Sequence, residues 1–293
     1  MLVSGALHNS RGAIFPALKA LGLQDEAVRR AWAAMRYGAW QTTTLLENWQ
    51  AYVTGQGEWR AVQYAGYYPK AVDITAYWRP TLQGLKSKQY DALAAKALPA
   101  VVLGLVGRVG QVGQQRMALL TDLIRADLRS ASKNALHSTL LHQVAVNLGA
   151  DEMPVLDAGF KLKALYQAGL DRFVLRLAKN FTARRNYLPE YQGGRPAEYG
   201  DLVRPLARSY AGQPLAATPP DRVQTWQQDG RAMRAEFWED LVLKEYPSSA
   251  QNPTFTVVAI YDPRFTEPWL LACPLPLSGP DLWGFYHARW PIE

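Results

Sequence analysis

The chain has 293 residues, of which 48% are hydrophobic, and a net charge of +7, so it can bury a sizeable core and is compatible with a polyanionic partner such as nucleic acid, without requiring one. The single cysteine, Cys273, lies in an apolar segment and excludes an internal disulfide and a thiolate metal cluster, so any metal ion is expected to have oxygen ligands. The chain contains no apolar run long enough to cross a membrane and its first residues lack the features of a signal peptide, so we expect a cytoplasmic protein with no membrane partner.

Residues 1–60 are predicted to be helical. Apolar residues recur at helical spacing in 10–22 and 25–38, and Thr44-x-x-Glu47 has the pattern of a capping box that opens a third helix. Several basic residues occupy the polar positions of these helices. Three short helices of this kind form either a DNA-binding module or an ordinary helical cap on the core, and the sequence does not decide between them.

Residues 61–180 are predicted to form the first part of a mixed β-sheet. We expect antiparallel strands at 71–78, 99–106 and 117–124, with Gly107–Gly113 as the hairpin turn between the last two. A helix at 130–148 follows, and then a βαβ unit made of strand 153–156, helix 161–168 and strand 172–178. This order predicts an α/β fold in which helices flank a mixed sheet of the RNase H type.

The last two regions differ in composition. Residues 181–252 are rich in proline and glycine and contain short apolar runs, which predicts a β-rich insertion. Residues 253–293 are predicted to return to the core with strands at 255–261 and 269–272, followed by a helix that starts near Gly279.

Two aspartates stand out because they interrupt or end apolar strands. Asp73 lies within Ala71-Val-Asp-Ile-Thr, and Asp157 ends Val155-Leu-Asp. A carboxylate in such a place is costly unless it binds something, although a strand-end aspartate such as Asp157 also serves to cap a following helix. Asp122, in the third predicted strand, is a rival candidate.

The C-terminal residues have the pattern Tyr286-x2-Arg289-x3-Glu293. In a helix, residues seven positions apart project in nearly the same direction, so one face would carry all three side chains. Pro291 either bends this helix or marks the first turn of a new one, and Glu293 can point toward the sheet in both cases.

The order Asp73, Asp157 and then Tyr286-x2-Arg289-x3-Glu293 resembles the DDE transposases of bacterial insertion sequences, in the branch marked by Y-x2-R-x3-E-x6-K. The resemblance covers most of the chain, with 84 residues from Asp73 to Asp157 and 136 from Asp157 to Glu293. It implies that Asp73, Asp157 and Glu293 are catalytic ligands of two Mg²⁺ ions, with Mn²⁺ as a substitute, and that Tyr286 and Arg289 contact DNA.

The resemblance also implies a double-stranded DNA substrate at the element ends and the target, in the bacterial nucleoid, and leaves open a homodimer on paired ends. Arg184 and Arg185 belong to a group of basic residues, interleaved with aromatic residues, that follows Asp157. They are expected to contact DNA phosphates, or else to form a solvated basic face over an aromatic core.

One departure concerns the end of the motif. The family's lysine falls seven residues after the glutamate, and this chain ends at Glu293, so we expect weak activity or none. Two alternatives therefore stay open. One is a truncated DNA-binding remnant that has lost catalysis, and the other is a carbohydrate-active enzyme with paired carboxylates, suggested by 10 Trp and 15 Tyr residues.

Overall fold

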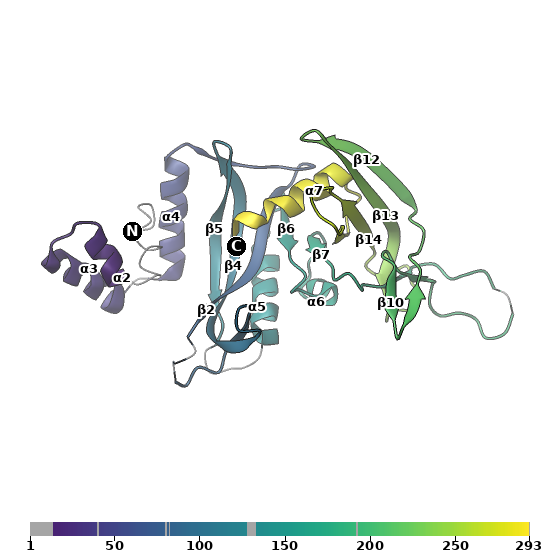
Figure 1. The fold of residues 1–293 in the computed structure, drawn as a ribbon, viewed down its shortest axis with the longest axis horizontal. Helices are drawn as coiled ribbons and strands as arrows, with labels where there is room; N and C mark the ends of the chain where they lie inside the picture. Colours follow the sequence, from purple (N-terminus) through teal and green to yellow (C-terminus); the bar gives the residue numbers. More distant parts are fainter. Residues whose placement is uncertain are drawn as a thin grey trace. The chain divides into compact units, whose positions relative to one another are not determined.

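The computed structural model describes residues 14–39, 41–79, 81, 83–127, 133–191 and 193–292 (Figure 1). The chain divides into two compact units, Met1–Asn48 and Trp49–Glu293. No helix within the described ranges has both the length and the apolar composition needed to cross a bilayer.

The described residues between 14 and 55 form helices, whereas residues 1–13 of the predicted helical region 1–60 lie outside the described residues. These helices are α2 (Ile14–Ala20), α3 (Asp25–Tyr37) and α4 (Thr42–Gly55). The predicted capping box is wrong, because α4 begins two residues before Thr44, and the carbonyl of Gln41 already accepts a hydrogen bond from the N–H of Leu45 (3.0 Å). Thr44 and Glu47 therefore lie inside the helix, where neither can cap its first turn.

The second unit is built on a 13-stranded sheet. Its strands are β1 (Trp59–Ala61), β2 (Tyr68–Trp78), β3 (Lys88–Asp91), β4 (Lys96–Val112), β5 (Gln115–Arg125), β6 (Glu152–Leu156), β7 (Val174–Arg176), β8 (Ala183–Arg185), β9 (Leu202–Val203), β12 (Arg222–Gln228), β13 (Arg231–Leu243), β14 (Phe255–Tyr261) and β15 (Trp269–Cys273). A separate hairpin consists of β10 (Arg208–Tyr210) and β11 (Gln213–Leu215).

The order of the strands is β1-β4-β2-β6-β7-β15-β14-β13-β8-β9, with β5 paired to β4 on one side. Strands β2, β4 and β5 are antiparallel, whereas β6 is parallel to β2 and β7 is parallel to β6. The predicted α/β class, with three antiparallel strands followed by a βαβ unit, is confirmed. Strands β14 and β15 continue the same sheet, and through β13 they join it to the β-rich segment 181–252.

Helices cover both faces of the sheet. On one face, α5 (Lys133–Val146) and α6 (Leu162–Gln167) pack Leu140, Leu141 and Leu165 against Val72 and Leu156. On the other face lie α7 (Gly279–Ala288), drawn in yellow in Figure 1, and a 3₁₀ turn at Trp290–Ile292. This second face has its own core, in which buried α7 residues pack against strands β6, β7, β13, β14 and β15.

The predicted glycine-rich turn at Gly107–Gly113 is shorter than expected. Strand β4 continues to Val112, so only Gly113 and Gln114 connect it to β5, and Gly113 has a φ of +57° that favours glycine. Gly110 serves a different purpose, because a Cβ atom there would lie 2.4 Å from the ring of Trp59. A glycine in a strand can thus mark a close contact with a neighbouring side chain instead of a turn.

A buried ion network lies at the amino end of β6. Glu152 is 3% exposed, and its carboxylate accepts hydrogen bonds from Lys70 Nζ (2.6 Å), Arg108 Nη2 (2.8 Å) and the N–H of Gly149 (3.0 Å). Burial raises the pKa of Glu152, but these hydrogen bonds outweigh it, and the net pKa lies below the ordinary value for glutamate. The network ties β2, β4 and β6 together through one carboxylate.

Replacing Glu152 by glutamine is expected to lower the free energy of unfolding by about 3–5 kcal/mol, because Lys70 would remain buried without its counter-charge. Urea denaturation followed by circular dichroism measures this loss. Glu198→Gln, in the exposed pair of Glu198 with Arg195, is the matched control and should cost less than about 1 kcal/mol. Equal effects of the two substitutions would contradict the structural role assigned to Glu152.

Candidate active site

The two predicted aspartates lie side by side at the carboxyl edge of the sheet. In the parallel pairing of β2 with β6, the last paired residues are Val72 and Leu156, and the next residue of each segment is Asp73 or Asp157. Neighbouring strands are about 4.8 Å apart, so the two carboxylates are within reach of one shared group. One strand pairing thus brings together two residues that are 84 positions apart in the sequence.

Asp73 belongs to the face covered by α7. Val72 and Leu156 point into the core beneath α5 and α6, and successive residues of a strand point to opposite faces. Their predecessors Ala71 and Val155 accordingly pack in the cores on the α7 side. Asp73 is 9% exposed.

Asp157 is only partly buried. Its Oδ1 accepts a hydrogen bond from the N–H of Gly159 (2.9 Å), which fixes the turn that leads into α6. A Cβ atom at Gly159 would approach Oδ1 to 2.9 Å, so this turn is best formed by glycine.

Asp122 lies on the opposite face. It pairs with Val106, which packs in the core under α5, and its carboxylate accepts hydrogen bonds from the Gln143 side chain of α5 and from the N–H of Leu123. The sheet therefore separates Asp122 from Asp73. The rival that the sequence left open does not share a site with Asp73.

The C-terminal segment brings Tyr286 and Arg289 to the face that carries Asp73. Arg289 Nη1 is 3.8 Å from Asp73 Oδ1, and the side chains of this pair are 4% and 13% exposed. The guanidinium also lies over the rings of Tyr286 (5.6 Å) and Trp290 (5.5 Å). Arg289 is thus fixed between one carboxylate and two aromatic rings.

Arg176 is a site residue that the sequence analysis noted only as one of several basic residues. It ends β7, one position beyond the paired residues Leu156 and Leu175. The register of β6 with β7 therefore aligns Arg176 with Asp157. Its guanidinium lies 5.4 Å from the centre of the Tyr286 ring. Burial lowers the pKa of Arg176, the nearby Arg289 lowers it further, and a hydrogen bond with Tyr286 opposes both effects.

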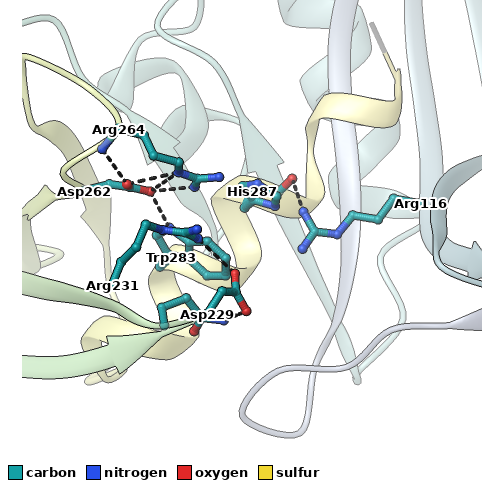
Figure 2. A network of polar contacts seen from close by, with 8 residues as sticks. Arg116, Asp229, Arg231, Asp262, Arg264, Trp283 and His287 are labelled. Carbon is teal, nitrogen blue, oxygen red and sulfur yellow. Dashed lines mark hydrogen bonds and ion pairs between the residues drawn. The ribbon is translucent and has the colours of Figure 1, made fainter.

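Helix α7 is anchored from two sides (Figure 2). Trp283 Nε1 donates to the buried carboxylate of Asp262 (3.3 Å), which also accepts from Arg264 Nη2 (2.6 Å). On the other side, Arg116 Nη1 donates to the carbonyl of His287 (3.1 Å). Burial raises the pKa of Asp262, but its hydrogen bonds from Arg264 and Trp283 outweigh burial and lower it overall.

Arg184 and Arg185 are held by the insertion itself. Arg185 forms a two-pronged ion pair with Asp221 (2.5 and 2.6 Å) and is 8% exposed. Arg184 donates to the carbonyls of Gly200 (2.8 Å) and Lys244 (3.0 Å). The hydrogen bond with Asp221 raises the pKa of Arg185. Their predicted contact with DNA stays a prediction, and these partners describe a structural role.

Other arginines of the insertion also pair with carboxylates of the same sheet. These ion pairs are Arg222 with Glu239, Arg231 with Asp229, and Arg234 with Glu236. The pattern is compatible with the alternative of a solvated basic face, because each of these three arginines has a neighbouring carboxylate.

The carboxylate oxygens of Asp73 and Asp157 are ligands of the type that a magnesium ion prefers. Mg²⁺ prefers hard oxygen ligands and retains several waters, so a site with one or two protein carboxylates suffices to bind it. Within the described residues, no group of three or more His, Cys, Asp or Glu side chains is arranged to hold a metal. The predicted third ligand, Glu293, lies outside the described residues.

Comparison with known proteins finds no protein family whose pattern matches the chain, and no matching curated protein. The assignment of a function therefore depends on the residues and on their geometry.

Replacing Asp262 by asparagine is expected to destabilise α7, because a charged acceptor of hydrogen bonds from Arg264 and Trp283 is lost. Hydrogen bonds to charged groups contribute about 1.5–3 kcal/mol, so the amides of α7 should exchange with solvent roughly 10- to 100-fold faster. Hydrogen–deuterium exchange measures this change. Asp229→Asn, at an exposed partner of Arg231, is the control, and an equal effect would contradict the anchoring role of Asp262.

Proposed function

We propose that this chain is a DNA transposase of the DDE kind, built on an RNase H-like sheet, that cleaves DNA and transfers strands with the help of divalent metal ions. The order β5-β4-β2-β6-β7 supports the RNase H-like part, because three antiparallel strands in sequence order are followed by two strands parallel to the first. This is the arrangement that the sequence pattern predicts for such a core.

The observation that carries the proposal is the register of Asp73 and Asp157 on neighbouring parallel strands. Neighbouring carboxylates can share bound cations, and Arg289 already lies beside Asp73 (3.8 Å). Bound Mg²⁺ ions would activate a water or a 3′ hydroxyl as the nucleophile and neutralise charge on the phosphate. Asp73 and Asp157 would hold them, and Glu293 is proposed as the third ligand.

Two cationic side chains lie beside this site and would bind a DNA backbone once the Arg289 side chain, which is 4% exposed, is uncovered. Arg176 ends the strand next to Asp157, and Arg289 lies beside Asp73. Guanidinium groups bind phosphate oxygens with paired hydrogen bonds, so they are suited to hold a phosphodiester in line with the nucleophile. Tyr286, which contacts both arginines, keeps them oriented.

The reaction has two steps. Water first attacks the phosphorus at one end of the element, which breaks the bond to the 3′ oxygen and frees a 3′ hydroxyl. This hydroxyl then attacks a phosphodiester of the target DNA, forming one bond as another breaks. Double-stranded DNA is the substrate in both steps, within the bacterial nucleoid, and two chains on paired ends would join both ends to one target.

The carbohydrate-active alternative loses part of its support. It was suggested by 10 Trp and 15 Tyr residues together with paired carboxylates, and three of the tryptophans, Trp238, Trp269 and Trp283, are only 1%, 4% and 5% exposed. These rings fill the hydrophobic core around α7 and the insertion.

The test is nicking of a supercoiled plasmid that carries the DNA flanking the gene, in the presence of Mg²⁺ or Mn²⁺. Asp73→Asn and Asp157→Asn should each reduce the nicking rate at least about 100-fold, since each removes a metal ligand worth several kcal/mol. Both variants should still bind the DNA. Gel electrophoresis and fluorescence anisotropy measure the two properties.

Asp122→Asn is the matched control, because it makes the same chemical change on the face of the sheet opposite to Asp73. Its nicking rate should stay within about threefold of the natural protein. Equal losses in all three variants, or nicking that persists in chelator, would overturn the proposal. DNA binding without nicking by the natural chain would favour the catalytically inactive remnant.

A further inference from the structure

A cavity lies around the turn that follows Asp157, on the α5 and α6 face of the sheet. It has a volume of about 510 Å³, within the range of small-ligand sites. Its lining residues come from α5 and from the segment 159–168, and they are His137, Ser138, Leu141, His142, Gly159, Phe160, Lys161, Ala164, Gln167 and Ala168.

The lining has an apolar floor and a polar rim. Leu141 and Phe160 are 1% and 5% exposed, and the ring of His137 lies 5.1 Å from that of Phe160. The rim carries the exposed side chains of His142 and Lys161. None of the lining residues is acidic, so the rim favours an anion and the floor accepts a flat apolar group.

The cavity adjoins the turn that follows Asp157. Gly159 lines it, and the N–H of this residue donates to Asp157. Lys161 is four residues beyond Asp157, and four residues of chain span at most about 14 Å, whereas DNA rises about 3.4 Å per nucleotide. A strand that crosses the carboxyl edge of the sheet at Asp157 would therefore reach the cavity within about four nucleotides.

We propose that this cavity binds one nucleotide of the DNA strand that continues past the bond to be cut, with the phosphate at Lys161 and His142 and the sugar and base over Phe160. This inference rests on the proposed function for the identity of the strand. The chemistry of a cationic rim above an aromatic floor is that of a nucleotide site.

Lys161→Ala tests the phosphate contact, and Lys163→Ala is its matched control, because Lys163 is an exposed lysine of α6 that does not line the cavity. With a fluorescent duplex oligonucleotide, Lys161→Ala should weaken binding about five- to tenfold and reduce the slope of log affinity against log salt by about 0.9. Lys163→Ala should change the affinity less than twofold. Equal effects of the two substitutions would overturn the proposal.

A cross-link tests the position of the strand. The only cysteine, Cys273, is 1% exposed and burial raises the pKa of its thiol to about 12, so a cysteine introduced on the surface is the reactive one. Ser138→Cys, on the rim, should form a disulfide with DNA that carries a thiol tether within about four nucleotides of the nick. Thr139→Cys, an exposed neighbour outside the cavity, should not. Equal yields from both variants would contradict the site.

Failure of the two proposals gives different results. If Asp73→Asn, Asp157→Asn and Asp122→Asn all lost nicking equally, while Lys161→Ala and Lys163→Ala still differed in DNA affinity, the transposase function would be refuted and the nucleotide site supported. Nicking that depends on Asp73, together with no difference between the two lysine variants, would refute the nucleotide site alone. Binding of 5′-dAMP that Lys161→Ala abolishes, without any effect on DNA affinity, would overturn the DNA strand as occupant in favour of a free nucleotide.

Discussion

The parallel pairing of β2 with β6 is the constraint on which the candidate site depends. It matches Val72 with Leu156, so the next residues, Asp73 and Asp157, lie side by side. A shift of one residue in this pairing would place the side chains of β6 on the wrong face and separate the carboxylates. The buried Glu152, bonded to Lys70 of β2, fixes the same pairing at its other end.

Successive side chains of these strands point to opposite faces of the sheet, so the two faces carry different residues. One face packs α5 and α6 and forms the larger core, and the other presents Asp73 to the C-terminal segment that carries α7 and Arg289. Because Asp262 and Arg116 anchor α7, the helix holds Tyr286 over Arg176 and leads directly to Arg289. The proposed metal ligand Asp73 and the larger core thus lie on opposite sides of the same strands. The acid on the other side, Asp122, is bonded to α5.

Local sequence pattern was enough to predict many helices and strands, but it did not predict which distant strands pair. The strand at 255–261 has the predicted bounds, and the apolar segments of β2 and β6 are also strands. The register between β2 and β6 joins residues 84 positions apart, which no local pattern encodes. For the same reason the sequence did not reveal that Asp221 holds Arg185. Gly107–Val112 belongs to the predicted turn but is strand. Glycine occurs both in turns and where a side chain packs closely on a strand, and the contact of Gly110 with Trp59, which distinguishes the two, is tertiary.

The most direct measurement is a crystal structure of the full chain grown with Mn²⁺, with the metal located by its anomalous scattering. The account predicts a Mn²⁺ peak bound by oxygens of both Asp73 and Asp157, at about the 2.0–2.2 Å typical of such ions. Contact with these two carboxylates would establish the shared metal site. A Mn²⁺ ion bound only elsewhere, or no ion at these aspartates at saturating concentration, would contradict it.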